Sequence, residues 1–147
     1  MPTDPSYTPA ADIARDREHL ISRFIATRSQ SEQIAGRLSV EDQQVQSMPD
    51  VSPTKWHLAH VTWFFETFVL KPHAPGYDEF DPAFGYLFNS YYETLGPRHA
   101  RPDRGLLTRP SNDEVMAYRA HVDQAVRAFM LASDDETFAA AADLLEL

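Results

Sequence analysis

The amino-acid sequence predicts an all-α fold, an up-down bundle of four helices. Apolar residues recur at intervals of three and four over long stretches, and helix start signals precede three of these stretches. No segment alternates polar and apolar residues as a strand would. At 147 residues, the chain is long enough for one domain with a sizeable core.

The first helix is predicted over residues 11–38, after a proline-rich segment at residues 1–10 that predicts a flexible N-terminal tail. This stretch contains no proline, and charged residues occupy the positions opposite the apolar ones. Its predicted core face consists of Ile13, Leu20, Ile21, Phe24, Ile25, Ile34 and Leu38.

The second helix follows a polar connector. Ser52 is predicted as its N-cap and Pro53 as its first residue, where the missing N–H needs no partner. The helix should run to Val69 or Leu70 and end before Pro72. It is apolar around most of its circumference, which predicts a central position in the domain.

Residues 71–110 contain many of the prolines and glycines, and the aromatic segment 85–95 lies among them. This composition predicts a short helix between two long irregular connections. Connections of this length within a compact domain are more often functional than not.

Two further helices are predicted at the C-terminal end. Ser111 and Glu114 form a capping box, and Ser133 with Glu136 predicts a second helix start. The core face of the first consists of Val115, Tyr118, Val122, Ala125, Val126 and Phe129. The last helix has acidic residues and no cap at Leu147, which predicts that it is cut short.

Composition excludes several functional classes. A net charge of −9 and a pI near 5.0 argue against nucleic-acid binding. The sequence has no long apolar run, so no membrane partner is expected, and no signal-peptide pattern, which makes the cytoplasm the default location. Without cysteine, a metal site would depend on histidine and carboxylate ligands.

His57 and His60 are candidate metal ligands because residues three apart share a helix face. Histidines on a partly apolar helix are more often hydrogen-bonded core or surface residues, and this interpretation stays open. Glu66 falls on the other side of the helical wheel, so this helix alone cannot form a site of two histidines and one carboxylate.

Arg98, Arg101 and Arg104 recur at intervals of three in a proline-rich segment of an acidic chain. Guanidinium groups suit carboxylate or phosphate recognition, although these could equally pair with the chain's own Asp103 or Glu93. Nine aromatic residues could line a pocket for a cationic ligand or form core: Trp56, Trp63, Phe64, Phe65, Phe68, Tyr86, Phe88, Tyr91 and Tyr92.

Three segments carry a family resemblance: "MPDVSPTKWHLAHVTWFFETFVL", "FGYLFNSYYETLGPRHARPDRGLLTRPS" and "EVMAYRAHVD". Together they resemble the N-terminal, DinB-like four-helix domain of the EgtB-type ergothioneine biosynthesis enzymes. This resemblance covers residues 11–147. It implies an iron-dependent sulfoxide synthase, an oxidoreductase that uses O2 to join hercynine to γ-glutamylcysteine or cysteine.

The resemblance also implies roles for particular residues. The family holds a non-haem Fe(II) with three histidines, and the first of them, in an "LAH" motif, corresponds to His60. His57 is not a ligand in this pattern. An arginine pair that binds the carboxylates of the thiol substrate corresponds to Arg101 and Arg104.

In the family, the other two ligands lie on an H-x-x-x-H helix that follows an "LLEL"-like stretch, and a second domain completes the active site. The resemblance therefore implies that this chain is a fragment, which lacks two of the iron ligands and the second domain. It also implies that iron binding by this chain alone is doubtful and that the chain alone is inactive. Further sequence after Leu147 is expected to contain H-x-x-x-H. The alternatives are a non-catalytic DinB-like helical module and another DinB-like metal-dependent thiol transferase.

Overall fold

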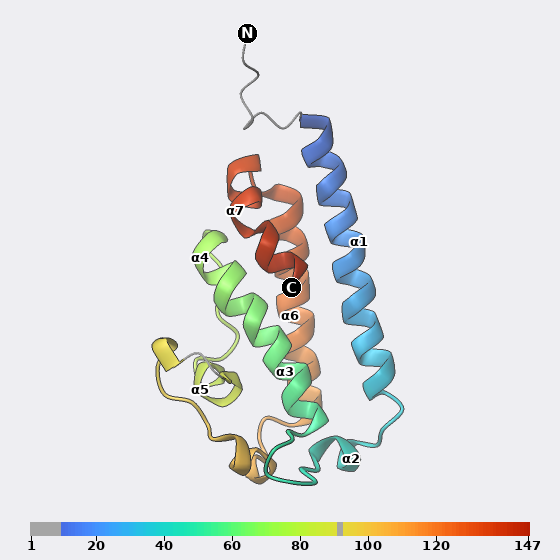
Figure 1. Ribbon diagram of the computed structural model, residues 1–147, viewed down its shortest axis with the longest axis vertical. Coiled ribbons are helices and arrows are strands. Elements are labelled where there is room, and N and C mark those ends of the chain that lie inside the picture. The colour runs from blue at the N-terminus through green and yellow to red at the C-terminus, as the bar shows by residue number, and fades with distance from the viewer. Residues whose placement is uncertain (1–9, 91–92) are drawn as a thin grey trace.

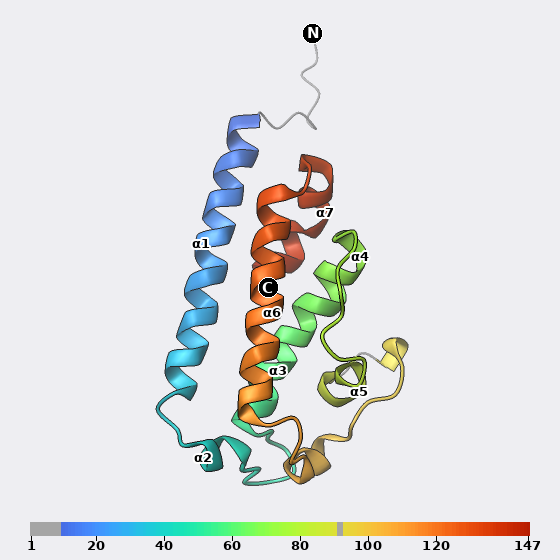
Figure 2. The ribbon, with the colours of Figure 1, turned by 180° about the vertical axis from the view of Figure 1, so that it is seen from behind.

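The computed structural model of the chain describes residues 10–90 and 93–147, and side chains from residue 16 onward except that of residue 93. All regular structure in these ranges is helical, which confirms the predicted fold class. The long helices lie side by side along one axis, with α1 and α3 running in opposite directions (Figure 1). A long connection then returns the chain along the bundle, so that α6 runs parallel to α3 before α7 turns back (Figure 2). The helix directions therefore do not alternate strictly, although the predicted up-down order requires alternation.

Helix α1 spans Ala10–Ala35 and ends earlier than predicted. Three predicted core positions, Ile25, Ile34 and Leu38, are 37%, 62% and 40% exposed, so these assignments are wrong. The chain turns after α1 and enters a short helix, α2 (Val40–Gln44), that the sequence analysis did not anticipate. Ser39 and Asp42 form its capping box. The predicted tail at residues 1–10 lies almost wholly outside the described residues, and the side chain of Ile13 is not described either.

The second long helix consists of α3 (Thr54–Phe65), a π-helical turn η1 (Glu66–Leu70) and α4 (Lys71–His73). Ser52 is not its N-cap: Pro53 takes that position and no side chain caps the helix. The helix also continues through Pro72 instead of ending before it. Lys71 N–H bonds the carbonyl of Glu66 in the wider turn of η1, and Pro72 follows directly as the second residue of α4.

The returning connection contains three short helical segments: α5 (Phe84–Phe88), η2 (Glu93–Leu95) and η3 (Arg101–Leu106). Helix α6 (Asn112–Ala132) begins with the predicted capping box of Ser111 and Glu114. Helix α7 spans Asp135–Glu146, and its N-cap is Asp134 in place of the predicted Ser133. The hydroxyl of Ser133 instead accepts a hydrogen bond from Arg17.

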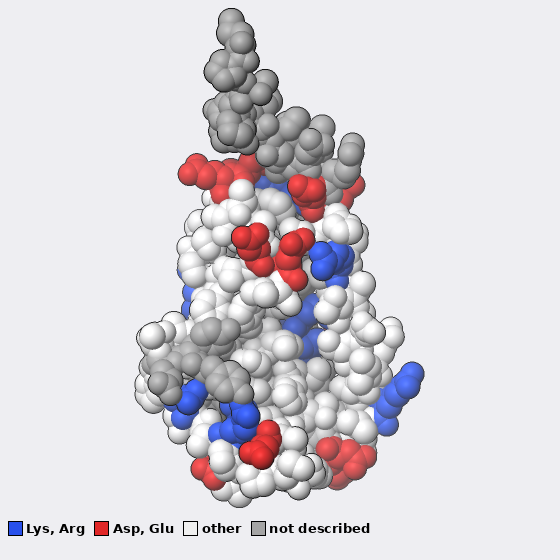
Figure 3. All heavy atoms as spheres, viewed as in Figure 1, with Lys and Arg blue, Asp and Glu red and all other residues white. Residues whose placement is uncertain are grey.

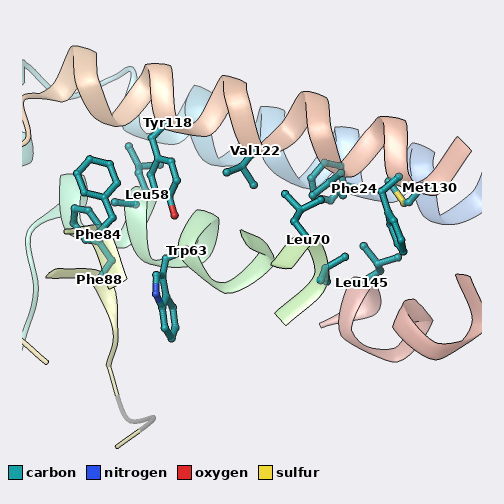
Figure 4. Packing of buried hydrophobic residues seen from close by; sticks show 14 of the residues in the cluster. Phe24, Leu58, Trp63, Leu70, Phe84, Phe88, Tyr118, Val122, Met130 and Leu145 are labelled. Carbon is teal, nitrogen blue, oxygen red and sulfur yellow. The ribbon is translucent and has the colours of Figure 1, made fainter. Parts of the chain in front are cut away.

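One continuous apolar core lies between α3, α6 and their neighbours (Figure 4). Trp63 and Tyr118 are almost completely buried, which confirms the central position predicted for the second helix. At one end of the core, Phe84 and Phe88 of α5 pack against Tyr118. Helix α5 is thereby fixed against the bundle although it is only five residues long.

A polar network crosses the bundle between α1, α3 and α6. Arg28 donates to Asp123 at 2.8 Å and to Thr62 at 2.5 Å. Arg119, which is fully buried, donates to Glu32 at 3.3 Å and to the carbonyl of Leu58 at 3.0 Å. Each arginine is thus paired with one carboxylate, as buried guanidinium groups require.

Among the described residues, no helix is both long and apolar enough to cross a membrane.

Candidate functional site

The aromatic face of α3 forms a ladder of three stacked rings. His60 lies between Trp56 and Trp63, with ring centroids 4.6 and 5.6 Å away and interplanar angles of 14° and 17°. These residues recur at i, i+4 and i+7, which places them on one helix face. The two indoles are buried and hold the His60 ring in one orientation, while His60 itself stays partly exposed.

The end of α5 fixes this ladder from the side. The last carbonyls of a helix have no partner within it, and here two of them accept side-chain donors from α3. Trp56 Nε1 donates to the carbonyl of Leu87 at 2.9 Å, and His60 Nδ1 lies 2.6 Å from the carbonyl oxygen of Phe88. Because a carbonyl only accepts, the proton of neutral His60 must be on Nδ1, which leaves the lone pair on Nε2.

His60 lines a cavity of about 470 Å³ between α1, α3 and the end of α7. Phe24, Phe64 and Phe65 supply much of its apolar wall, and Arg28 lies among them. In the space-filling view, basic side-chain atoms are visible among uncharged residues in the middle of this face (Figure 3). His60, the predicted metal ligand, therefore lies next to a cavity that is large enough for further ligands or a small molecule.

The two candidate histidines differ in their surroundings. Burial lowers the pKa of both, and nearby Arg104 adds to the effect on each. His57 is the more exposed and stands edge-on to Trp56 at 5.6 Å. The lowered pKa favours the neutral form of His60 at pH 7, which is the form that binds a metal ion.

The lowered pKa values predict how stability depends on pH. Below pH about 6.5 the unfolded chain takes up protons at His57 and His60 that the folded chain does not bind as readily. The free energy of unfolding should therefore fall as the pH is lowered from 7.5 to 5.5, as measured by urea denaturation. His60→Gln should reduce this dependence. An unchanged slope of the unfolding free energy against pH in this variant would contradict the assignment.

The arginine cluster lies at the opposite end of the ladder from Trp63. Arg104 Cζ is 3.5 Å from the centroid of the Trp56 ring, and Arg104 Nη1 donates to Ser52 Oγ at 2.8 Å. The Arg104 side chain is buried, and its Nε has no hydrogen-bond partner among the described residues. Burial and the charges of Arg101 and Arg98 lower the pKa of Arg104 to about 10. An unpaired buried donor beside other cations is suited to an anion.

Arg98 and Arg101 are only partly buried. Arg98 Nη1 donates to the carbonyl of Ser90, three residues after the carbonyl that bonds Trp56. The predicted arginine site and the predicted metal ligand are thus neighbours, since Trp56 contacts both Arg104 and His60. The alternative partner Glu93 has no described side chain.

Several residues of this arrangement were not predicted from the sequence. Ser52 was assigned a capping role and instead binds Arg104. Leu87 and Phe88 act through main-chain carbonyls, which leave no signal in a sequence. The spacing of Trp56, His60 and Trp63 could have indicated the ring ladder.

The donor groups of the described residues determine whether the site could hold a metal ion. Within it, no group of three or more histidine, cysteine, aspartate or glutamate side chains is placed to hold a metal ion. Glu66 is 1% exposed and accepts hydrogen bonds from Tyr118 Oη at 2.9 Å and from Tyr77 Oη. The part of the chain that the structure describes therefore offers one well-oriented imidazole and does not by itself fit an iron ion.

Comparison with known proteins gives one result that bears on identity. No curated protein matches the sequence. A profile of the DinB superfamily matches residues 23–144, which include α3, the ring ladder and the arginine cluster. The chain therefore belongs to the DinB superfamily.

Proposed function

We propose that this domain supplies one iron ligand and the thiol-substrate site of a sulfoxide synthase of ergothioneine biosynthesis, acting in the cytoplasm. The reaction would join hercynine to γ-glutamylcysteine or cysteine with O2. The observation that carries the proposal is the hydrogen bond between His60 Nδ1 and the carbonyl of Phe88, at 2.6 Å. Metal-bound histidines typically donate their second ring N–H to such an acceptor, which directs the other nitrogen to the metal.

His60 would be the contribution of this chain to the iron site. One imidazole does not hold Fe(II) usefully, because ligand number and geometry determine affinity. The remaining ligands are proposed to come from further polypeptide that carries the family's H-x-x-x-H helix. Iron, when bound, would supply the site for O2 and the thiolate.

Arg101 and Arg104 would bind the carboxylates of the thiol substrate. Arg101 offers a partly exposed guanidinium, and the unpaired Nε of Arg104 leaves a donor for an anion. Anchoring the substrate at its carboxylates would hold its thiol in a defined place, which is how positioning residues contribute to rate.

The substrate half of the proposal is tested on this chain by calorimetric titration with γ-glutamylcysteine. Loss of one charge-assisted contact in Arg101→Ala should weaken binding about tenfold to a hundredfold. Arg127→Ala, which removes an exposed arginine of α6, is the matched control and should leave the affinity unchanged. Equal losses in both variants would indicate attraction by net charge and would refute the arginine site.

The metal half is tested by NMR of the His60 imidazole, using long-range couplings between ring protons and nitrogens. At pH 7.5, Nδ1 should carry the proton and Nε2 should be unprotonated, opposite to the tautomer usually favoured by free histidine. A proton on Nε2 would remove the ligand assignment. That result, together with no γ-glutamylcysteine binding, would favour a non-catalytic helical module.

A further inference from the structure

The turn that carries Arg101 and Arg104 is bonded at both ends by one glutamine side chain, which comes from the connection between α2 and α3. Gln46 Nε2 donates to the carbonyl of Arg101 at 2.7 Å, and Gln46 Oε1 accepts from Gly105 N–H at 2.6 Å. Gln46 Nε2 also donates to the carbonyl of Val51 at 2.9 Å, on its own connection. One amide group thus bonds both ends of the arginine turn and fixes them to the segment that leads into α3.

The same connection holds the Arg104 side chain. Ser52 Oγ accepts from Arg104 Nη1 at 2.8 Å, and the guanidinium lies 3.5 Å over the Trp56 ring. Gln46 therefore positions the main chain of the turn, while Ser52 and Trp56 position the arginine head. Gln46 has no place in the apolar core, since its contacts are with two connections at the surface.

Gly105 shows how closely the two connections approach. A Cβ atom at residue 105 would lie 2.7 Å from Gln46 Cβ and 2.8 Å from Gln46 Oε1. Contacts this short force one of the two segments to move. Only a residue without a side chain allows the glutamine amide to reach the Gly105 N–H.

We propose that Gln46 is a positioning residue for carboxylate binding by Arg101 and Arg104. This inference rests on the function proposed for that arginine pair. Without Gln46, the turn would sample several arrangements, and a bound dicarboxylate would have to order it. That ordering is a cost of binding that the wild-type chain has already met on folding.

The test measures two quantities on the full 147-residue chain. The first is the affinity for γ-glutamylcysteine by calorimetry. Gln46→Ala should weaken it about threefold to tenfold, while the midpoint of thermal unfolding changes by only a few degrees. The second is acrylamide quenching of tryptophan fluorescence. If Arg104 is released from Trp56, quenching should increase in Gln46→Ala, as it should in Arg104→Ala. Trp63 is buried and should contribute the same background in every variant.

Two matched pairs of variants serve as controls. Gln30→Ala removes an exposed glutamine of α1 and should match the wild type in both measurements. Gly105→Ala should reproduce the effects of Gln46→Ala, whereas Gly85→Ala, where a Cβ would meet nothing within 4 Å, should not.

Wild-type affinity and wild-type quenching in Gln46→Ala would overturn the inference. If γ-glutamylcysteine does not bind, or Arg101→Ala binds it unchanged, the proposed function of the arginine pair fails. Acrylamide quenching of Gln46→Ala then tests the position of the turn separately. An increase in quenching supports the control of the turn by Gln46, and wild-type quenching overturns that control.

Discussion

Replacing Asp123 with alanine is expected to lower the free energy of unfolding by about 3–5 kcal/mol. Asp123 accepts from Arg28 Nε at 2.8 Å, and the Arg28 side chain is only 6% exposed. Burial raises the pKa of Asp123 even though Arg28 acts against this shift. The pair is therefore costly to bury, and most of the loss in the variant would come from the guanidinium left without a counter-charge beside Arg119.

This prediction is checked by urea denaturation at pH 7.5. Asp123→Asn keeps an acceptor for Arg28 without the charge and should fall between the wild type and Asp123→Ala. Asp143→Ala removes an exposed carboxylate of α7 and should change stability by less than about 0.5 kcal/mol. A loss for Asp123→Ala no greater than that for Asp143→Ala would show that Arg28 reaches solvent when its partner is removed.

Glu66→Ala is expected to destabilise the chain by a similar amount, about 3–5 kcal/mol. The Glu66 carboxylate accepts from Tyr118 Oη at 2.9 Å, from Phe80 N–H at 3.3 Å and from Tyr77 Oη. The variant would leave these donors facing a cavity, and Tyr118 is fully buried. Burial, together with the same contacts with Glu66, raises the pKa of both tyrosines.

Thermal or urea unfolding measures this effect, with Glu79→Ala as the matched control. Glu79 is paired with Lys71 at a partly exposed position, so its removal should cost less than about 1 kcal/mol. Glu66→Gln should be intermediate, because its amide can accept from only part of the donor set. Equal stability of Glu66→Ala and Glu79→Ala would mean that water replaces the carboxylate.

The sequence predicted the helices well where local signals and packing agree. The capping box at Ser111 marks the start of α6, and its predicted core positions Val115, Val122 and Val126 are buried. The prediction failed at the end of α1, where Ile34 lies within the helix but is exposed and Leu38 lies beyond its last residue. The capping box of Ser39 and Asp42 was a readable signal that α1 had already ended.

Ser52 shows why the predicted site was less complete than the fold. A serine before Pro53 is typical of an N-cap, and only the tertiary structure shows that Arg104 competes for its hydroxyl. Gln46 likewise carries no sequence motif, because its partners are main-chain groups more than fifty residues away. His60, Arg101 and Arg104 were assigned by resemblance to a family, and their roles remain predictions.

The carbonyls of residues 87–90 have a consequence for protein engineering. Leu87, Phe88 and Ser90 accept from Trp56, His60 and Arg98 within four consecutive residues. A designer who transplants α3 alone into another bundle would obtain the imidazole without the acceptor that sets its tautomer. The smallest portable unit is α3 together with α5 and Ser90, and inserting one residue in that short stretch would misalign both halves of the site at once.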